Sequence, residues 1–237
     1  MVMQIDIMDS IRILRMAHNE ENKITNDFLK DFNSALDHIQ ADGGAKAVVI
    51  TGASEKFFCT GFDLGWLMNK PKDEWVPFFL EMDRLLHRLL LYPKPLVSAI
   101  NGHCFAGGLF IAFCCDYRVM REDRGWCCMP EIDLGIGLPP GTVALISYVL
   151  GKRNAELFAI TGKRFNAKEA FEMGAIDEIA KAEEVIPRAI EYARLLSGKR
   201  PDVFFRHKKE LRGEVARIIT EDDPDYIRAF MGEKLKG

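Results

Sequence analysis

The sequence lacks the features that mark several large classes of protein. Its six cysteines form no CxxC pair, so neither a zinc site nor a redox-active disulfide is indicated. No apolar run approaches the roughly 20 residues that a transmembrane helix requires. Lysine plus arginine (32) nearly balance aspartate plus glutamate (35), and the resulting net charge of −3 argues against a nucleic-acid-binding or membrane-surface protein.

Targeting signals and the common nucleotide and hydrolase motifs are also missing. The N-terminal MVMQIDIMDS is acidic and too short in apolar character for a signal peptide, and the C-terminal GEKLKG matches no peroxisomal or retention signal. We therefore expect a cytoplasmic protein whose cysteines are buried free thiols. GxSxG, GxxxxGK[ST] and HExxH do not occur, and the GxG of LGIGL lacks the spacing of a dinucleotide-binding loop.

What is present is the pattern of a globular α/β protein. Of the 237 residues, 48% are hydrophobic and 28% charged, which is enough apolar material for a sizeable core. Predicted strands lie at 4–16 (two strands joined near 9–10), 45–52, 95–102, 117–120 and 125–132, the last ending at Pro130. Predicted helices lie at 25–41 (capped by Thr25), 73–91, 107–115, 142–150, 154–161, 167–173, 183–196, 203–219 and 224–235, with a loop at 54–64. The recurring strand-strand-helix order indicates a repeated unit, and the last third is mostly helical.

Two glycine-containing segments have the form of a site that stabilises negative charge. In CTGFDL, Gly61 permits a tight turn, which frees the N–H of Phe62 to point into a pocket. In AGGL, a helix begins at Gly107 and Gly108, so its first N–H groups lack internal partners and carry the positive end of the helix dipole. Two N–H donors from separate loops make an oxyanion hole. The alternative is that these are ordinary turn and helix-packing glycines.

A third segment, MPEI, carries the candidate acid or base. Pro130 cannot extend a strand, so Glu131 is displayed at a strand end with apolar residues on both sides. Partial desolvation there would raise the pKa of this carboxyl toward the range useful for proton transfer. The alternative is a solvated loop glutamate. His103 and Asp133 are weaker candidates, because a lone histidine is more often structural and Asp133 shares a face with Glu131 only in a strand.

Four segments in this order, KFFCTGFDL, PLVSAINGHCFAGGLFIAFCCDYRVM, MPEIDLGIGLPPG and GKRNAELFAITGKRFNAKEAFEMGAIDEI, resemble the crotonase (enoyl-CoA hydratase/isomerase) superfamily. The resemblance covers about residues 5–197 and is looser beyond. It implies a spiral of ββα units over 1–197, a helical trimerisation region at 198–237, and a homotrimer or dimer of trimers. It also implies an acyl-CoA thioester substrate, with coenzyme A as part of the substrate, no separate cofactor or metal, and no nucleic-acid or membrane partner.

The resemblance assigns roles to individual positions. It implies that Phe62 and Gly107 donate the two N–H groups of the oxyanion hole to the thioester carbonyl. The implied substrate- and CoA-binding positions are Lys23 and Ile24 beside Asn22, the loop residues Thr60, Gly61, Asp63 and Leu64, and Gly108 and Phe110 on the helix. The candidate walls of the acyl pocket are Trp66, Phe78, Phe79, Phe110 and Trp126, although aromatic residues at helical spacing often belong to the core.

One position departs from the pattern of the family's hydratases, which carry two glutamates. The first glutamate is replaced by Phe110, and the second is kept as Glu131. Hydration needs two carboxylates to hold and activate a water molecule, whereas one carboxylate suffices to move a proton from C2 to C4. We therefore expect a Δ3-Δ2-enoyl-CoA isomerase of fatty acid β-oxidation with Glu131 as the base. The alternatives are hydration, hydrolysis or decarboxylation of a CoA thioester, or a non-catalytic acyl-CoA-binding protein.

Overall fold

The computed structural model describes residues 3–236, and residues 231–236 by their backbone alone. The strands are β1 (Met3–Met8), β2 (Ile11–Met16), β3 (Ala47–Gly52), β4 (Phe57–Cys59), β5 (Leu96–Ile100), β6 (His103–Phe105), β7 (Tyr117–Arg121), β8 (Cys127–Cys128) and β9 (Glu178–Ala180). The helices are α1 (Asn26–Ala41), α2 (Leu64–Met68), α3 (Trp75–Leu90), α4 (Gly107–Phe113), α5 (Pro140–Thr161), α6 (Ala167–Glu172), α7 (Val185–Ser197), α8 (Pro201–Glu221) and α9 (Asp223–Lys236). Short 3₁₀ helices occur at Lys72–Glu74, Pro130–Ile132 and Ala182–Glu184.

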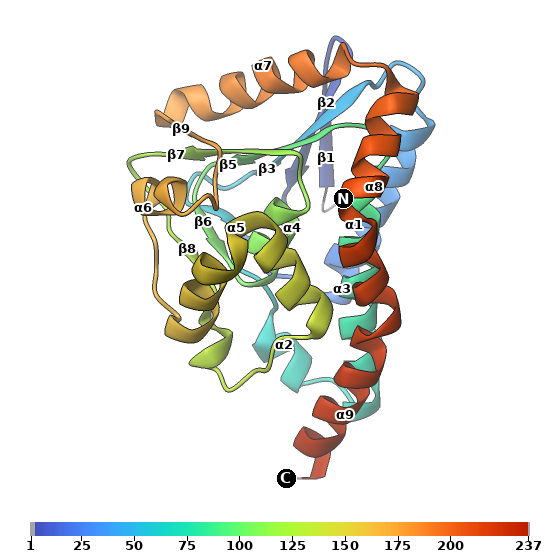
Figure 1. Cartoon of the computed structure of the whole chain (residues 1–237), viewed down its shortest axis with the longest axis vertical. Coiled ribbons are helices and arrows are strands. Elements are labelled where there is room, and N and C mark those ends of the chain that lie inside the picture. Colours follow the sequence, from blue (N-terminus) through green and yellow to red (C-terminus); the bar gives the residue numbers. More distant parts are fainter. Residues whose placement is uncertain (1–2, 237) are drawn as a thin grey trace.

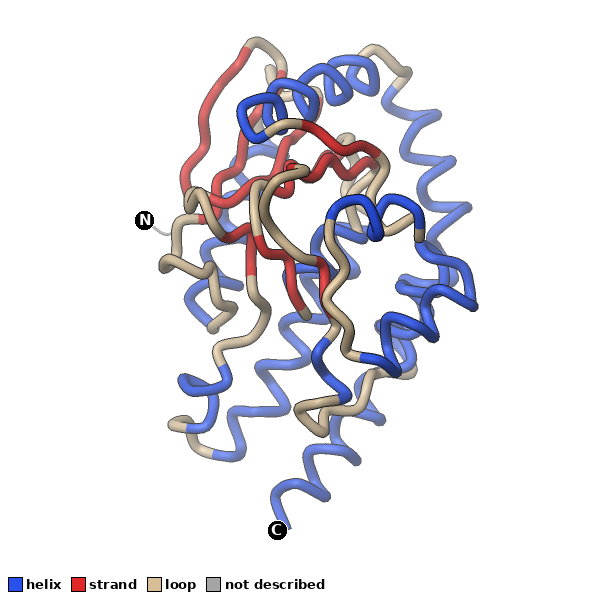
Figure 2. Tube along the Cα trace, turned by 90° about the vertical axis from the view of Figure 1, so that its left-hand side faces the viewer, coloured by secondary structure: helices blue, strands red, loops and turns tan. Residues whose placement is uncertain are grey.

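Two sheets form the centre of the molecule, with the helices around them (Figure 2). The larger sheet has the order β1-β2-β3-β5-β7-β9, and only the β1–β2 pair is antiparallel. The smaller sheet has the order β4-β6-β8 and is parallel throughout. Three successive units therefore each send one strand to the larger sheet and the next to the smaller sheet before continuing into helix. The predicted α/β fold built from ββα units is confirmed.

The central strands of the larger sheet are buried on both faces, as expected for an uninterrupted apolar run in a parallel sheet. One face packs against α7, which lies across the top of Figure 1 and contributes Ala189, Ile190 and Ala193 to a small core cluster. The other face adjoins the main core, which includes buried residues of α1, α3 and α4. All six cysteines are buried free thiols, as predicted.

The C-terminal helices pack along one side of this core. Helix α8 lies against α3 and α5, and Val215, Ala216 and Ile219 belong to the main core. Helix α9 packs on α3, α5 and α8 and carries the C-terminus to the end of the molecule opposite α7 (Figure 1). Within residues 3–236, no helix combines the length and apolar character needed to cross a membrane.

The segment around Pro130 differs from its predicted strand. The strand itself is limited to β8, and Pro130 instead begins a 3₁₀ helix that contains Glu131. The fixed φ of proline suits the first turn of a helix, where no N–H donor is needed. Glu131 is therefore presented by a helical turn, and the possible strand face shared with Asp133 does not exist.

Several other elements were divided differently in the sequence prediction. The loop predicted before α2 contains strand β4, and the short strands β6 and β9 were not predicted. The two helices predicted at 142–150 and 154–161 are confirmed, because non-helical backbone at Gly151, with φ +71°, divides α5 into two helical parts. The remaining predicted helices and strands are confirmed with small shifts at their ends, including α1 with Thr25 as its N-cap, whose side chain accepts from Phe28 N.

Candidate active site

The Gly61 turn lies directly against the start of α4. Gly61 has φ +86°, a conformation that side chains disfavour. A Cβ placed on Gly61 would lie 2.6 Å from Ala106 Cβ and 3.1 Å from Gly107 N. The two loops predicted to supply N–H donors are therefore in van der Waals contact, and glycine at position 61 is what permits it.

The turn is fixed by a short parallel bridge that orients Phe62. Ile24 N donates to Gly61 O at 2.8 Å, and Asp63 N donates to Ile24 O at 3.0 Å. Because N–H groups alternate along an extended segment, the N–H of Phe62 points away from Ile24. Among the described residues, no hydrogen-bond acceptor is recorded for it. The donor predicted at Phe62 is thus left open by its neighbours.

The entry to α4 is an unusual backbone conformation at a non-glycine residue. Ala106 has φ +50° and ψ −126°, while its N–H is fixed by Cys128 O at 2.9 Å. Its carbonyl accepts from Leu109 N and Phe110 N, which closes the first helical turn. The N–H groups of the two intervening glycines belong to the first turn, where a helix offers no internal acceptor. Strained backbone of this kind persists only where the surrounding structure imposes it.

Close packing explains both glycines of this helix. A Cβ on Gly107 would lie 2.9 Å from Ile24 Cδ1, and one on Gly108 would overlap the carbonyl oxygen of Cys59. Gly107 is therefore constrained by the segment that carries Ile24, and Gly108 by strand β4. The sequence-based alternative of helix-packing glycines describes Gly108 well, whereas the contact with Gly61 makes Gly107 part of the paired loops.

Glu131 is a buried carboxyl group with one free oxygen. Its residue is 8% exposed, and Oε2 has no hydrogen-bond partner among the described residues. Desolvation by burial raises the pKa of Glu131 from 4.5 to about 7. The carboxyl group can therefore accept and release a proton near neutral pH, which is the property predicted for it.

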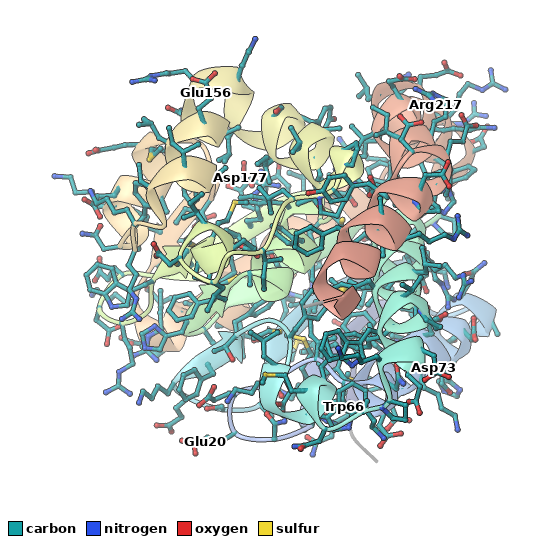
Figure 3. The ribbon with its side chains drawn as sticks, turned by 90° about the horizontal axis from the view of Figure 1, so that it is seen from below. Glu20, Trp66, Asp73, Glu156, Asp177 and Arg217 are labelled. Atoms are coloured by element: carbon teal, nitrogen blue, oxygen red, sulfur yellow. The ribbon has the colours of Figure 1, made fainter. Side chains whose placement is uncertain are left out.

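A mostly apolar cavity contacts the Gly61 loop, α4 and Glu131 and holds about 820 Å³ of empty space, including its opening to solvent, although Gly107 itself does not line it. Its walls come from the Gly61 loop, α3, α4, the 3₁₀ turn of Glu131, α5 and α9. The lining residues of these predicted loops and turns are Thr60, Phe62, Leu64, Ala106, Phe110 and Glu131. Figure 3 looks onto this end of the molecule, where α9 lies between α5, which carries Glu156, and α2, which carries Trp66.

Phe110 is 5% exposed and forms part of the cavity wall. Phe79 also lines the cavity, as predicted. Phe78 and Trp66 instead pack in an aromatic cluster with Phe62 behind the wall. Trp126 is wrongly placed in the prediction, because it lines a separate surface hollow.

His103 lies in the same separate hollow, together with Lys56 and Asp123. Burial, followed by the charge of Lys56, lowers the pKa of His103. Asp133 also lies outside the cavity lining, and its side chain faces the turn at Gly162. Neither weaker candidate therefore joins Glu131 in the cavity.

The predicted CoA-contacting residues are divided between different surroundings: Thr60 and Leu64 line the cavity, whereas Ile24 is fully buried. Lys23 is partly exposed and pairs with Glu21 at 3.1 Å, and Thr60 Oγ1 lies 3.2 Å from the same carboxylate. Asp63 caps α2 by accepting from Trp66 N, so its side chain fixes the loop. Thr60 therefore lines the cavity, whereas Lys23 and Asp63 lie outside its lining.

The cavity contains a second carboxyl group that was not predicted from the sequence. Asp83 on α3 is 8% exposed, lines the cavity, and has an unpartnered Oδ2. Burial and, to a smaller extent, the nearby Asp223 raise the pKa of Asp83 from 3.8 to about 8. The sequence feature that could have indicated Asp83 is its position as a single acidic residue beside the apolar Phe79, Met82 and Leu86.

Comparison with known families agrees with this geometry. The profile of the enoyl-CoA hydratase/isomerase family matches residues 6–222, and the chain belongs to this family. It is accordingly an enzyme of the crotonase fold that acts on CoA thioesters.

Its relatives include both kinds of enzyme that the family name covers. Enoyl-CoA delta isomerase 3 of Arabidopsis thaliana is 30% identical over 87% of this chain and 90% of its own length. A putative enoyl-CoA hydratase of Thermus thermophilus is 34% identical over 79% of this chain and 74% of its own length. The crystal structure of a probable enoyl-CoA hydratase from Mycobacterium tuberculosis superposes with a TM-score of 0.92 at 29% identity, covering 99% of both chains.

Proposed function

We propose that this enzyme is a Δ3-Δ2-enoyl-CoA isomerase of fatty acid β-oxidation, with Glu131 as its single proton-transferring residue. The observation that carries the proposal is the pairing of Phe110 with Glu131 in the cavity wall. By its resemblance to the family, Phe110 stands at the position where the hydratases carry their first glutamate. A phenyl ring cannot hold a nucleophilic water, and it makes the cavity drier.

In the proposed reaction, the thioester oxygen of a 3-enoyl-CoA accepts hydrogen bonds from the N–H groups of Phe62 and Gly107. Glu131, as the carboxylate, removes a proton from C2, and the electron pair moves onto the thioester oxygen as a dienolate. The two donors stabilise this charge as it develops. The carboxylic acid of Glu131 then returns the proton to C4, so the double bond moves from C3–C4 to C2–C3 and the enzyme is regenerated.

The proposal extends to coenzyme A and to assembly. CoA would lie along the Gly61 loop and contact Thr60, Asp63, Leu64 and the segment of Lys23 and Ile24. The active form would be a homotrimer or dimer of trimers. Light scattering of the purified protein would then give three or six times the chain mass, and a monomer at assay concentration would contradict this part of the proposal.

Hydration is the second candidate, and Asp83 is the observation that favours it. A hydratase uses two carboxyl groups to position and activate water, and Asp83 provides a second one in the cavity. Burial raises the pKa of Asp83 to about 8, which disfavours a role as a base and leaves a role as an acid open. Isomerisation is favoured over hydration by Phe110 at the family's first glutamate position, because the proton shuttle needs only Glu131.

The deciding experiment offers the enzyme two substrates separately. We expect rapid conversion of a 3-enoyl-CoA to the conjugated 2-enoyl-CoA, followed by the rise in thioester absorbance. With a 2-enoyl-CoA in water, we expect no comparable formation of the 3-hydroxyacyl product by chromatography. Hydration as fast as isomerisation would reject the isomerase assignment in favour of the second candidate.

A further inference from the structure

Two buried carboxyl groups lie beside the cavity at the junction of α3 and α9. Asp83 on α3 is 8% exposed, and Asp223 at the start of α9 is fully buried. Asp223 Oδ1 accepts from Gly141 N at 2.6 Å, and a Cβ on Gly141 would crowd the other oxygen of this carboxyl. The Oδ2 atoms of both aspartates have no hydrogen-bond partner among the described residues.

Neighbouring cations do not compensate these carboxyl groups. Within the described chain, no salt bridge involves Asp83 or Asp223. Asp83 also lines an outer groove, and the two arginines of that groove pair elsewhere, Arg84 with Glu81 and Arg228 with Asp225. Two uncompensated carboxyls in apolar surroundings favour the neutral form of at least one of them. The pKa of Asp83 rises to about 8 and that of Asp223 to about 6, so Asp83 is the one that carries a proton at neutral pH.

Asp83 therefore presents a polar group without a recorded partner to the part of the cavity wall that α3 forms. Its helical neighbours Phe79, Met82 and Leu86 are apolar and line the same cavity, as does Ile227 of α9. A buried hydroxyl donor or carboxyl oxygen that lacks a partner is costly, and a ligand that supplies the partner recovers that cost on binding.

We propose that Asp83 is a specificity-determining residue whose carboxyl group hydrogen-bonds an oxygen on the acyl chain of the substrate, so that the enzyme favours hydroxy- or oxo-acyl-CoA thioesters over plain hydrocarbon chains. This inference rests on the proposed binding of an acyl-CoA in the cavity. The role is one of binding, because the proton transfer of the reaction remains with Glu131. Asp223 contributes by its charge and by its fixed position at Gly141.

The test uses saturated acyl-CoA thioesters, which bind but do not isomerise. Calorimetry compares a medium-chain acyl-CoA with a set of hydroxy-acyl-CoA thioesters of the same length, each with the hydroxyl on a different carbon. We expect at least one hydroxylated thioester to bind the unaltered protein about 10- to 100-fold more tightly than the plain one. In D83L this preference should fall to about 1, with plain acyl-CoA bound equally well or better.

Two further variants keep the result interpretable. D83N retains the shape and a hydrogen-bonding group, so it should keep part of the preference, and it replaces D83L if that variant fails to fold. D225N alters a carboxyl group on the exposed face of α9 and should leave the preference unchanged. Equal affinity of the unaltered protein for all the thioesters, or a preference that survives in D83L, would overturn the role of Asp83. Since these ligands do not react, an absence of isomerase activity would reject the proposed function without changing this result.

Discussion

The protein buries carboxyl groups in two regions and treats them in opposite ways. Under α8, the side chain of Asp116 is 9% exposed. It accepts from Leu96 N at 2.7 Å and Lys208 Nζ at 3.0 Å, and it forms an ion pair with Arg212 Nη1 at 3.0 Å. In the cavity, Glu131 and Asp83 are similarly buried, yet each keeps one oxygen without a partner. The carboxyl group under α8 is compensated by donors and cations, whereas each carboxyl group in the cavity has an oxygen that can still accept a hydrogen bond.

This difference separates a structural carboxylate from a chemically available one. Asp116 joins β5 to α8, and Arg212 also donates to the carbonyl of Cys114, so the cluster holds the C-terminal helices against the core. Both carboxylate oxygens of Asp116 contact a cation, so its charge is compensated within the protein. Desolvation without compensation raises the pKa of a carboxyl group, and such groups are candidates for proton transfer or ligand binding.

The largest expected effect is on catalysis at Glu131. E131Q preserves shape but removes the proton acceptor, so the kcat for 3-enoyl-CoA isomerisation should fall by roughly 10²–10⁴-fold. The affinity for a saturated acyl-CoA should change little, because the proposed oxyanion donors are backbone groups that the substitution leaves in place. Stopped-flow kinetics and calorimetry measure the two quantities. Wild-type turnover by E131Q would remove Glu131 from the mechanism and erase the distinction between the two regions.

The next effect is on folding at Asp116. D116N leaves Lys208 and Arg212 buried without their anion, and the free energy of unfolding should fall by roughly 3–5 kcal/mol. Urea denaturation followed by circular dichroism measures this loss. D123N breaks the exposed pair with Arg121 and serves as the matched control, for which a much smaller loss is expected. A loss in D116N no larger than in D123N would mean that the buried cluster is not what holds α8.

The smallest effect is the dependence of stability on pH through Glu131. Its folded-state pKa of about 7 exceeds the unfolded value of 4.5, so its contribution is favourable below pH 4.5 and is lost as the pH rises through 7. E131Q lacks this cost and should exceed the unaltered protein in unfolding free energy by up to about 3 kcal/mol at pH 8. Near pH 4.5 the gain should disappear. A gain that does not vary with pH would show that ionisation of Glu131 is not its cause.

Much of the fold was predictable because it rests on local patterns. The apolar runs of β3 and β5 and the helical spacing of α1 and α3 are long enough to identify from sequence. The three-residue strands β6 and β9 are too short to show a period, and only pairing with neighbouring strands defines them. Pro130 indicated that no strand continues past it, but β8 already ends at Cys128, and the helical turn that Pro130 begins depends on packing.

Site residues could be predicted at positions where the backbone geometry admits only one type of residue. Gly61 and Gly107 were chosen because only glycine suits a tight turn and a close approach, and they lie in contact. Asp83 was not predicted as a site residue, because the apolar spacing of α3 indicates a core-facing helix and a single acidic residue does not change that pattern. The Asp116–Lys208 pair joins positions 92 residues apart, a contact that no local pattern contains.

The contact between Gly61 and Ala106 has a consequence for how such an enzyme can change over time. Direct contact between Gly61, Ala106 and Gly107 sets the separation of the two proposed donor loops. Phe62 also packs edge-on against Phe78 and Phe79 of α3, so the helix that lines the cavity supports one of these loops. Over time, the cavity wall can therefore change more freely on α9 than at these two positions of α3.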